Sequence, residues 1–205
     1  LRQKVGMVFQ FPEKQIFEET VIKDIMFGPL NYGATEAEAK QAALNAMDLV
    51  GLPQQYQDQS PIDLSGGQMR RVAIAGVLAM NPSILILDEP TAGLDPRGHA
   101  DIMALVARLH DEMGITIILV THQMDDVVQY AEQVVVMSHG EITKQGSPQD
   151  IFADLEWVRQ MQLTLPTSAE FAEQLRLAGF PLASRPLTLT DLTTAIVAEL
   201  GANHG

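Results

Sequence analysis

The apolar run Ile84-Leu85-Ile86-Leu87, which ends in Asp88-Glu89, is the feature that most constrains the fold of this chain. An unbroken aliphatic run predicts a strand that is buried on both faces, as at the centre of a parallel sheet. Ligands of open α/β sheets bind beyond the carboxyl ends of such strands. Asp88 could hold Mg²⁺ there through water, and Glu89 could deprotonate an attacking water. Taken alone, the acidic pair is equally well explained by a strand that reaches solvent.

Two adjacent glycines form the second motif, Leu-Ser-Gly-Gly-Gln at residues 64–68. Gly66 and Gly67 lack Cβ atoms, so the backbone can approach an anion closely, and the N–H groups of a helix that starts there point at it. Ser65 adds a hydroxyl group and Gln68 adds an amide. A plain Ser-Gly-Gly loop with a helix cap explains the motif equally well when it stands alone.

Three further polar residues occur where a predicted element starts or ends. Gln10 follows the apolar strand at 5–9, and its amide could bridge Mg²⁺ and water. His122 follows a second apolar run, 115–121, and could donate a hydrogen bond to a terminal phosphate. Asp95, which precedes Pro96, could serve only as the N-cap of the next helix. The other histidines are predicted to lie on the surface: His99, His110, His139 and His204.

Strands alternate with helices along most of the chain, which predicts an α/β fold built on a mostly parallel sheet. A core over 1–10 and 83–152 is interrupted at 11–82 by a segment without strands, which predicts a helical subdomain. Short helices separated by prolines follow over 153–205. The expected details are a helix over 21–27 that ends at Gly28-Pro29, a capping box of Thr35 with Glu38, a helix over 68–80, a third strand at 133–137 and a tight turn at His139-Gly140.

Composition excludes several classes of protein. The chain carries 13 Lys and Arg against 26 Asp and Glu, a net charge of −13, which argues against a nucleic-acid partner. It has no cysteine, so disulfides and thiolate metal sites are ruled out within it. No apolar run approaches the roughly 20 residues of a membrane helix. We therefore expect a cytosolic chain whose role at a membrane, if it has one, is supplied by a partner.

The order of these motifs resembles the ATPase subunits of ATP-binding cassette (ABC) transporters over residues 1 to about 152. The resemblance implies a P-loop NTPase-like (RecA-like) fold that binds ATP and Mg²⁺, with Asp88 and Gln10 holding the metal largely through water. It implies that Glu89 is the general base, His122 the switch histidine and Asp95 the D-loop aspartate. It identifies Gln10 as the Q-loop glutamine, Ile84 to Asp88 as the Walker B strand and Ser65, Gly66, Gly67 and Gln68 as the signature motif.

Three segments narrow the resemblance to energy-coupling factor (ECF) transporters, and to the second of their two paralogous ATPase subunits: 9–13, 27–29 and 67–80. Such subunits form a head-to-tail heterodimer on the cytoplasmic face of the cell membrane, under a transmembrane coupling protein. A separate membrane protein binds the substrate, a vitamin or metal ion. The segment 11–31 would meet the coupling protein, although it could also be a plain face of the helical subdomain.

No Gly-x-x-x-x-Gly-Lys-Ser/Thr phosphate loop occurs in the 205 residues. We expect that Leu1 is a truncation point and that this chain alone neither binds ATP well nor hydrolyses it. Two other functions stay open: a non-catalytic partner that lends its signature motif to an active paralogue, and, less favoured, a DNA-maintenance ATPase. In the tail, an apolar stripe at Trp157, Met161, Leu163 and Leu165 either packs on the domain or helps to hold the ATPase subunits together.

Overall fold

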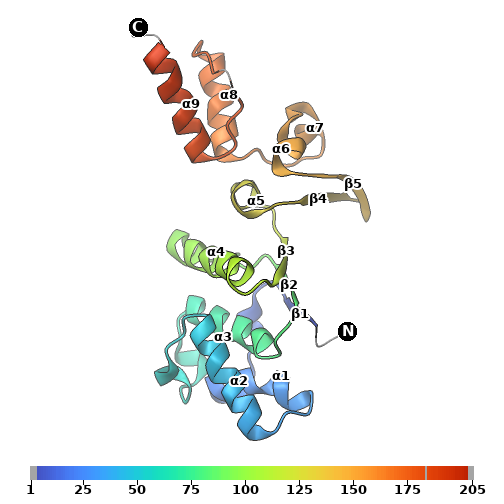
Figure 1. Ribbon diagram of the computed structural model, residues 1–205, viewed down its shortest axis with the longest axis vertical. Coiled ribbons are helices and arrows are strands. Elements are labelled where there is room, and N and C mark those ends of the chain that lie inside the picture. Colours follow the sequence, from blue (N-terminus) through green and yellow to red (C-terminus); the bar gives the residue numbers. More distant parts are fainter. Residues whose placement is uncertain (1–3, 183, 203–205) are drawn as a thin grey trace. The chain divides into compact units, whose positions relative to one another are not determined.

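The computed structural model describes residues 4–182 and 184–202, and it divides into two compact units, Leu1–Val120 and Thr121–Gly205 (Figure 1). The sheet of the first unit consists of β1 (Val5–Val8), β2 (Ile84–Asp88) and β3 (Thr116–Val120). All of its pairings are parallel, in the order β1-β2-β3. The expected α/β fold with a parallel sheet is therefore confirmed. The predicted domain boundaries at residues 10, 82 and 152 stay predictions.

The acidic strand lies at the centre of the sheet, as predicted. Leu85 and Leu87 of β2 are both 0% exposed and belong to the main core cluster of this unit. The expectation that residues 115–121 form a second buried strand is wrong in part, because Ile118 and Val120 are 47% and 49% exposed. Side chains alternate between the faces of a strand, and only one face of β3 packs into the core.

Residues 12–82 contain no strand, as predicted, and form the helical part of the first unit (Figure 1). Buried residues of its three α-helices, among them Ile25, Met47 and Val72, form one core with Leu85 and Leu87. The elements of this part are a 3-10 helix at Pro12–Gln15, α1 (Val21–Asn31), α2 (Glu36–Leu49), 3-10 helices at Gln54–Tyr56 and Pro61–Asp63, and α3 (Gly66–Leu78).

The predicted capping box at the start of α2 is present. The Glu38 amide donates to Thr35 Oγ1 at 3.3 Å, and the Thr35 amide donates to Glu38 Oε2 at 2.8 Å. These bonds from the Thr35 backbone and hydroxyl lower the pKa of the Glu38 carboxyl, because they favour its charged form. The helix thus begins where the sequence pattern placed it.

Helix α1 is longer than predicted: it continues through Gly28 and Pro29 to Asn31. Pro29 lies near the helix end, where a missing N–H costs a single hydrogen bond, and its ring is buried. A Cβ on Gly28 would lie 3.0 Å from the sulfur of Met80, so this glycine allows close packing against the chain that follows α3. Gly28 therefore marks a close contact between elements, and not a helix end.

Gly6 of β1 is required for the packing of α3 on the sheet. A Cβ at this position would lie 2.3 Å from Cγ1 of Val77, a stiff β-branched side chain, and 3.3 Å from Cγ of Pro82. We expect Gly6→Ala to lower the free energy of unfolding by about 1–3 kcal/mol, the usual effect of overpacking. Urea denaturation would measure it. Gly66→Ala, where a Cβ meets nothing within 4 Å, is the matched control, and equal stability of the two variants would contradict the prediction.

Helix α4 (Pro96–Asp111) completes the first unit, and the second unit begins with α5 (Met124–Tyr130). The predicted third strand exists as β4 (Val134–Ser138), but it pairs antiparallel with β5 (Glu141–Gly146) and is not part of the parallel sheet. The reason is the predicted turn between them: His139 and Gly140 have φ of 51° and 81°, the positive values of a two-residue hairpin turn.

The tail consists of α6 (Pro148–Phe152), α7 (Leu155–Gln160), α8 (Thr167–Leu177) and α9 (Leu189–Ala202), and α8 lies beside α9 (Figure 1). Trp157, Leu163 and Leu165 pack against the cluster that contains Phe152 and Val158. These contacts support packing within the second unit, while a role in holding ATPase subunits together stays a prediction. Among the described residues, no helix is both long and apolar enough to cross a membrane.

Candidate nucleotide site

The carboxyl end of β2 holds Glu89 in an unusual backbone conformation. Glu89 has φ of 48°, a left-handed value that costs a non-glycine residue on the order of 1–3 kcal/mol and is found most often at functional sites. Its amide donates to the Val120 carbonyl at 2.9 Å, and its own carbonyl accepts from the Ala92 amide at 3.1 Å. Oε2 of its carboxylate is buried. These two bonds hold the backbone from which the Glu89 side chain extends.

Gln10 reaches the same edge of the sheet. Strand β1 runs parallel to β2 with Val8 opposite Leu87, so the carboxyl ends of both strands lie together. Gln10 lies two residues beyond the end of β1 and is exposed, while Asp88 is partly buried at the last position of β2. The structure thus brings three of the predicted site residues, Gln10, Asp88 and Glu89, to one edge.

The described residues form no dedicated metal cage at this edge. In the part of the chain that the structure describes, no group of three or more His, Asp or Glu side chains could hold an ion. This fits Mg²⁺, which keeps several waters and takes only one or two protein oxygens beside those of substrate phosphates. Asp88 and Gln10 offer oxygens of that kind, and their role as ligands stays a prediction.

The signature residues form the N-terminus of α3. Ser65 is the N-cap, and its Oγ accepts from the Gln68 amide at 3.3 Å, while Gln68 Oε1 accepts from the Ser65 amide at 2.9 Å. The predicted helix cap is therefore real. It uses Ser65 Oγ only as an acceptor and Gln68 only through Oε1, so the Ser65 hydroxyl proton and the Gln68 amide nitrogen can still donate to an anion.

The two glycines of the motif are not required by the fold. Neither Gly66 nor Gly67 has a positive φ, and a Cβ built on either meets nothing within 4 Å. Glycine is also a poor helix former, by about 1 kcal/mol relative to alanine. Open space in front of the positive end of a 13-residue helix suits an anion from outside this chain.

Asp95 is the N-cap of α4, and its Oδ1 accepts from the Gly98 amide at 2.6 Å. The simpler explanation of this residue is therefore present in the structure, and its predicted D-loop role stays a prediction. His122 is exposed and lies in the second unit, two residues after β3 ends. Its predicted role toward a terminal phosphate also stays a prediction.

Sequence reasoning missed Arg70, which is only 2% exposed in the middle of α3. Its Nη1 donates to the carbonyls of Pro90 at 2.8 Å and Ala92 at 2.9 Å, and its Nε and Nη2 donate to Glu13 Oε2 at 3.3 and 3.0 Å. The available signal was its position on the helix: Arg70 lies four residues before the core residue Ile74, so the two side chains share one face of α3.

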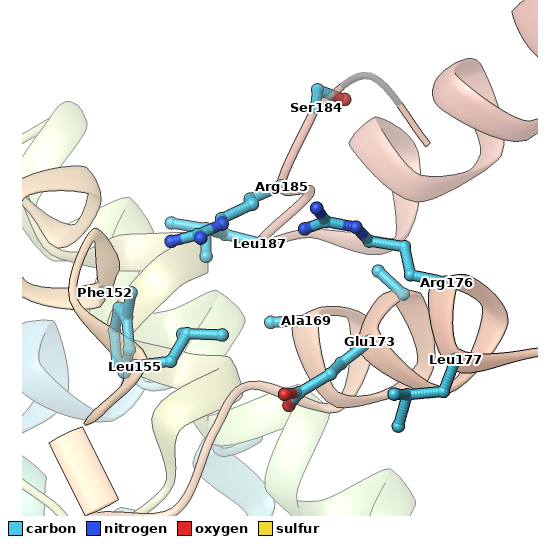
Figure 2. Close-up of a pocket in the computed structure, with 10 residues that line it drawn as sticks. Phe152, Leu155, Ala169, Glu173, Arg176, Leu177, Ser184, Arg185 and Leu187 are labelled. Atoms are coloured by element: carbon cyan, nitrogen blue, oxygen red, sulfur yellow. The ribbon is translucent and has the colours of Figure 1, made fainter. Parts of the chain in front are cut away.

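A cavity of about 350 Å³ lies in the second unit (Figure 2). Apolar side chains such as Phe152 and Leu187 line it together with Arg176 and Arg185, and Arg185 also donates to the Ala153 carbonyl at 2.7 Å. None of the residues predicted to bind nucleotide lines this cavity. We therefore assign it no part in the candidate site.

Comparison with known proteins agrees with the motifs. The sequence profile of the ABC transporter family matches residues 1–92. The chain is 58% identical over 205 residues to the energy-coupling factor transporter ATP-binding protein EcfA2 of Latilactobacillus sakei subsp. sakei, covering all of this chain and 70% of that protein. It is 54% identical over 200 residues to the protein of the same name from Enterococcus faecalis, covering 98% and 69%. The chain thus spans about 70% of the length of these relatives.

Solved structures give the same result. One similar structure is cbiO1 from Clostridium perfringens, part of the ABC transporter complex cbiONQ, with 44% identity and a TM-score of 0.68, covering 84% of this chain and 68% of that one. Another is the dimeric ATP-binding cassette MJ0796 bound to ADP and Pi, with 31% identity and a TM-score of 0.60, covering 72% and 64%. The predicted fold class and the predicted resemblance are both confirmed.

Proposed function

Because this chain belongs to the ABC transporter ATPases, and among them to the ATP-binding subunits of energy-coupling factor transporters, we propose that it hydrolyses ATP at a subunit interface to drive uptake of a micronutrient. Its own edge would supply Gln10, Asp88 and Glu89 to one nucleotide. Its signature residues, 65–68, would supply the N-terminus of α3 to the nucleotide of a paralogous ATPase. The cargo would be a vitamin or a metal ion.

One observation carries this proposal: Gln10, Asp88 and Glu89 meet at one sheet edge, with the backbone of Glu89 in a strained conformation. Mg²⁺ held there by Asp88 and Gln10 would neutralise charge on the phosphates when bound. Glu89 orients the attacking water of this chain's own nucleotide and takes its proton, while the donors at 65–68 bind phosphate oxygens of the nucleotide held by the paralogue.

The signature motif supports a head-to-tail pair. A helix N-terminus with glycines that the fold does not need offers its donors to a group outside the chain. A related cassette, MJ0796, was solved as a dimer with ADP and Pi. The arrangement we propose therefore places each nucleotide between two subunits, with Asp95 of this chain on its own side.

The segment 11–31 offers a surface for the membrane partner. Phe17 is 63% exposed, and its ring packs edge-to-face on that of Phe27 with centroids 4.7 Å apart. Both line a cavity of about 410 Å³ together with Pro12, Ile16 and Tyr32. An apolar, aromatic hollow of this kind suits a short amphipathic helix. We propose that a transmembrane coupling protein docks there, on the cytoplasmic face of the membrane, with a separate substrate-binding membrane protein.

The function is tested by comparing the isolated chain with the assembly. We expect the purified 205-residue chain to show no ATP turnover, because it contains no phosphate-loop lysine to hold the β- and γ-phosphates. A subunit that carries a phosphate loop ahead of these residues, assembled with its paralogue and the membrane proteins, should hydrolyse ATP and import substrate. Turnover can be followed as released phosphate. Hydrolysis by the isolated chain at the rate of the complex would contradict the prediction.

A second function is kept because the signature is intact: the chain could lend residues 65–68 to an active paralogue without catalysing anything itself. The strained Glu89 at the strand end favours catalysis, since a site that no longer reacts has no use for it. A complex in which Glu89→Gln leaves the ATP turnover rate unchanged would support this second function.

A further inference from the structure

We propose that Arg70 is a positioning residue that links the partner-facing segment at Pro12–Gln15 to the backbone that carries Glu89. The inference rests on the proposed function, in which Glu89 is the base and the segment 11–31 meets a membrane protein. No motif names Arg70 as a ligand of nucleotide. Its own contacts in the first unit assign the role.

The first link joins Arg70 to the catalytic loop. The guanidinium binds two carbonyls of the short segment that follows Glu89, those of Pro90 and Ala92, through a single nitrogen, Nη1. The Ala92 amide in turn donates to the Glu89 carbonyl. One buried cation therefore holds the turn that fixes the left-handed backbone of Glu89. A shift of Arg70 would move this turn and the carboxylate with it.

The second link joins Arg70 to the surface. Its Nε and Nη2 both donate to Oε2 of Glu13, whose side chain is 19% exposed. Glu13 lies in the 3-10 helix whose residues Pro12 and Gln15 line the hollow with Phe17 and Phe27. A protein that docks in that hollow would press on the helix that carries Glu13. A displacement of Glu13 would therefore be passed on to Pro90 and Ala92 through the side chain of Arg70.

A second contact follows the same route. Phe11 has φ of 54° and precedes this 3-10 helix, and its ring atom Cε1 lies 3.6 Å from where a Cβ on Gly93 would be. Phe11 and Glu13 thus both lie close to the loop after Glu89: the ring of Phe11 fills the space beside Gly93, and Glu13 reaches the loop through Arg70. Of these two connections, only the one through Arg70 is charged, and the guanidinium is buried. Because a buried cation that loses its carboxylate is strongly destabilised, movement of Glu13 is transmitted to Arg70 and is not absorbed by solvent.

Glu13→Gln in the assembled complex tests the proposal, because glutamine keeps the shape and an acceptor oxygen but removes the charge. The turnover rate is measured for the membrane complex and for the ATPase pair without membrane proteins. We expect kcat of the complex to fall about tenfold, the order of loss from a small misplacement of a catalytic group, with little change in KM. The stimulation by the membrane proteins should fall with it. Glu112→Gln, at an exposed carboxylate just beyond the end of α4 and outside the segment 11–31, should change neither quantity.

Two outcomes would overturn the proposal: kcat and stimulation that match the wild type, or an equal loss in the pair and the complex, as for a purely structural residue. If thermal unfolding shows that Glu13→Gln does not fold, Glu13→Asp replaces it. Aspartate keeps the negative charge on a side chain that is one methylene shorter. It should give the same loss of stimulation, and unchanged stimulation would overturn the proposal. If Glu89→Gln abolishes turnover while both Glu13 variants behave as wild type, only this inference fails. If Glu89→Gln has no effect, the proposed function fails.

Discussion

Replacing Glu89 with glutamine is expected to lower kcat for ATP hydrolysis in the assembled complex by about 10²–10⁴-fold, the usual contribution of a general base. The variant keeps the size and the hydrogen-bonding reach of the side chain and removes only its capacity to take a proton. The left-handed backbone at this position and its bonds to Val120 and Ala92 involve no carboxylate atom, so the turn should survive. ATP binding should therefore persist while turnover is lost, and the closed, ATP-bound pair should accumulate.

Phosphate release measures the rate, and size-exclusion chromatography in ATP measures the closed pair. Glu112→Gln is the matched control, because Glu112 is exposed beyond the end of α4 and carries the same charge. It should leave both quantities unchanged. A Glu89→Gln complex that hydrolyses ATP at the wild-type rate would remove this chain from the chemistry and leave it as the donor of a signature motif.

Replacing Gly67 with aspartate should separate stability from function. The position is the second residue of α3, a Cβ there has room, and a negative charge near a helix N-terminus is worth about 0.3–1 kcal/mol of stabilisation. The same charge would face the γ-phosphate of the paralogue's nucleotide. Two unit charges 4 Å apart repel by roughly 4 kcal/mol at an effective dielectric constant of 20. We therefore expect ATP turnover at that interface to fall by at least about a hundredfold, without loss of folding stability.

Gly67→Ala is the control for size alone. It should fold at least as stably as the wild type, because alanine is the better helix former, and it should lose less activity than Gly67→Asp. Urea unfolding of the subunit and phosphate release by the complex give the two readouts. A Gly67→Asp variant with normal turnover would show that the N-terminus of α3 does not face a nucleotide.

Local patterns were predictable because their physics lies within a few residues. The cap at Thr35, the helix start at Ser65 and the turn at His139 each depend on backbone donors and acceptors close in sequence. The central strand Ile84–Asp88 was equally readable, since only a strand in the middle of a parallel sheet is apolar throughout.

Two predictions were wrong for one reason, which is contact between residues distant in sequence. The first helix was predicted to end at Gly28-Pro29, but Gly28 packs against Met80 inside a longer helix. Strand β3 was expected to be buried, but only one of its faces meets the core. Each outcome depends on which surface packs against the residue, and the local sequence does not contain that information.

The sequence by itself determined the chemistry of this protein, because the residue types and the order of Gln10, Ser65 to Gln68, Asp88 and Glu89 are sufficient to identify an ABC ATPase. The tertiary structure alone decided which of these residues act together and what holds them. The register of β1 on β2 brings Gln10 to Asp88, and the fold of α3 buries Arg70 between Glu13 and the turn after Glu89. The physical reason is that a buried cation is stable only where distant parts of the chain supply its acceptors, and sequence spacing does not encode that meeting.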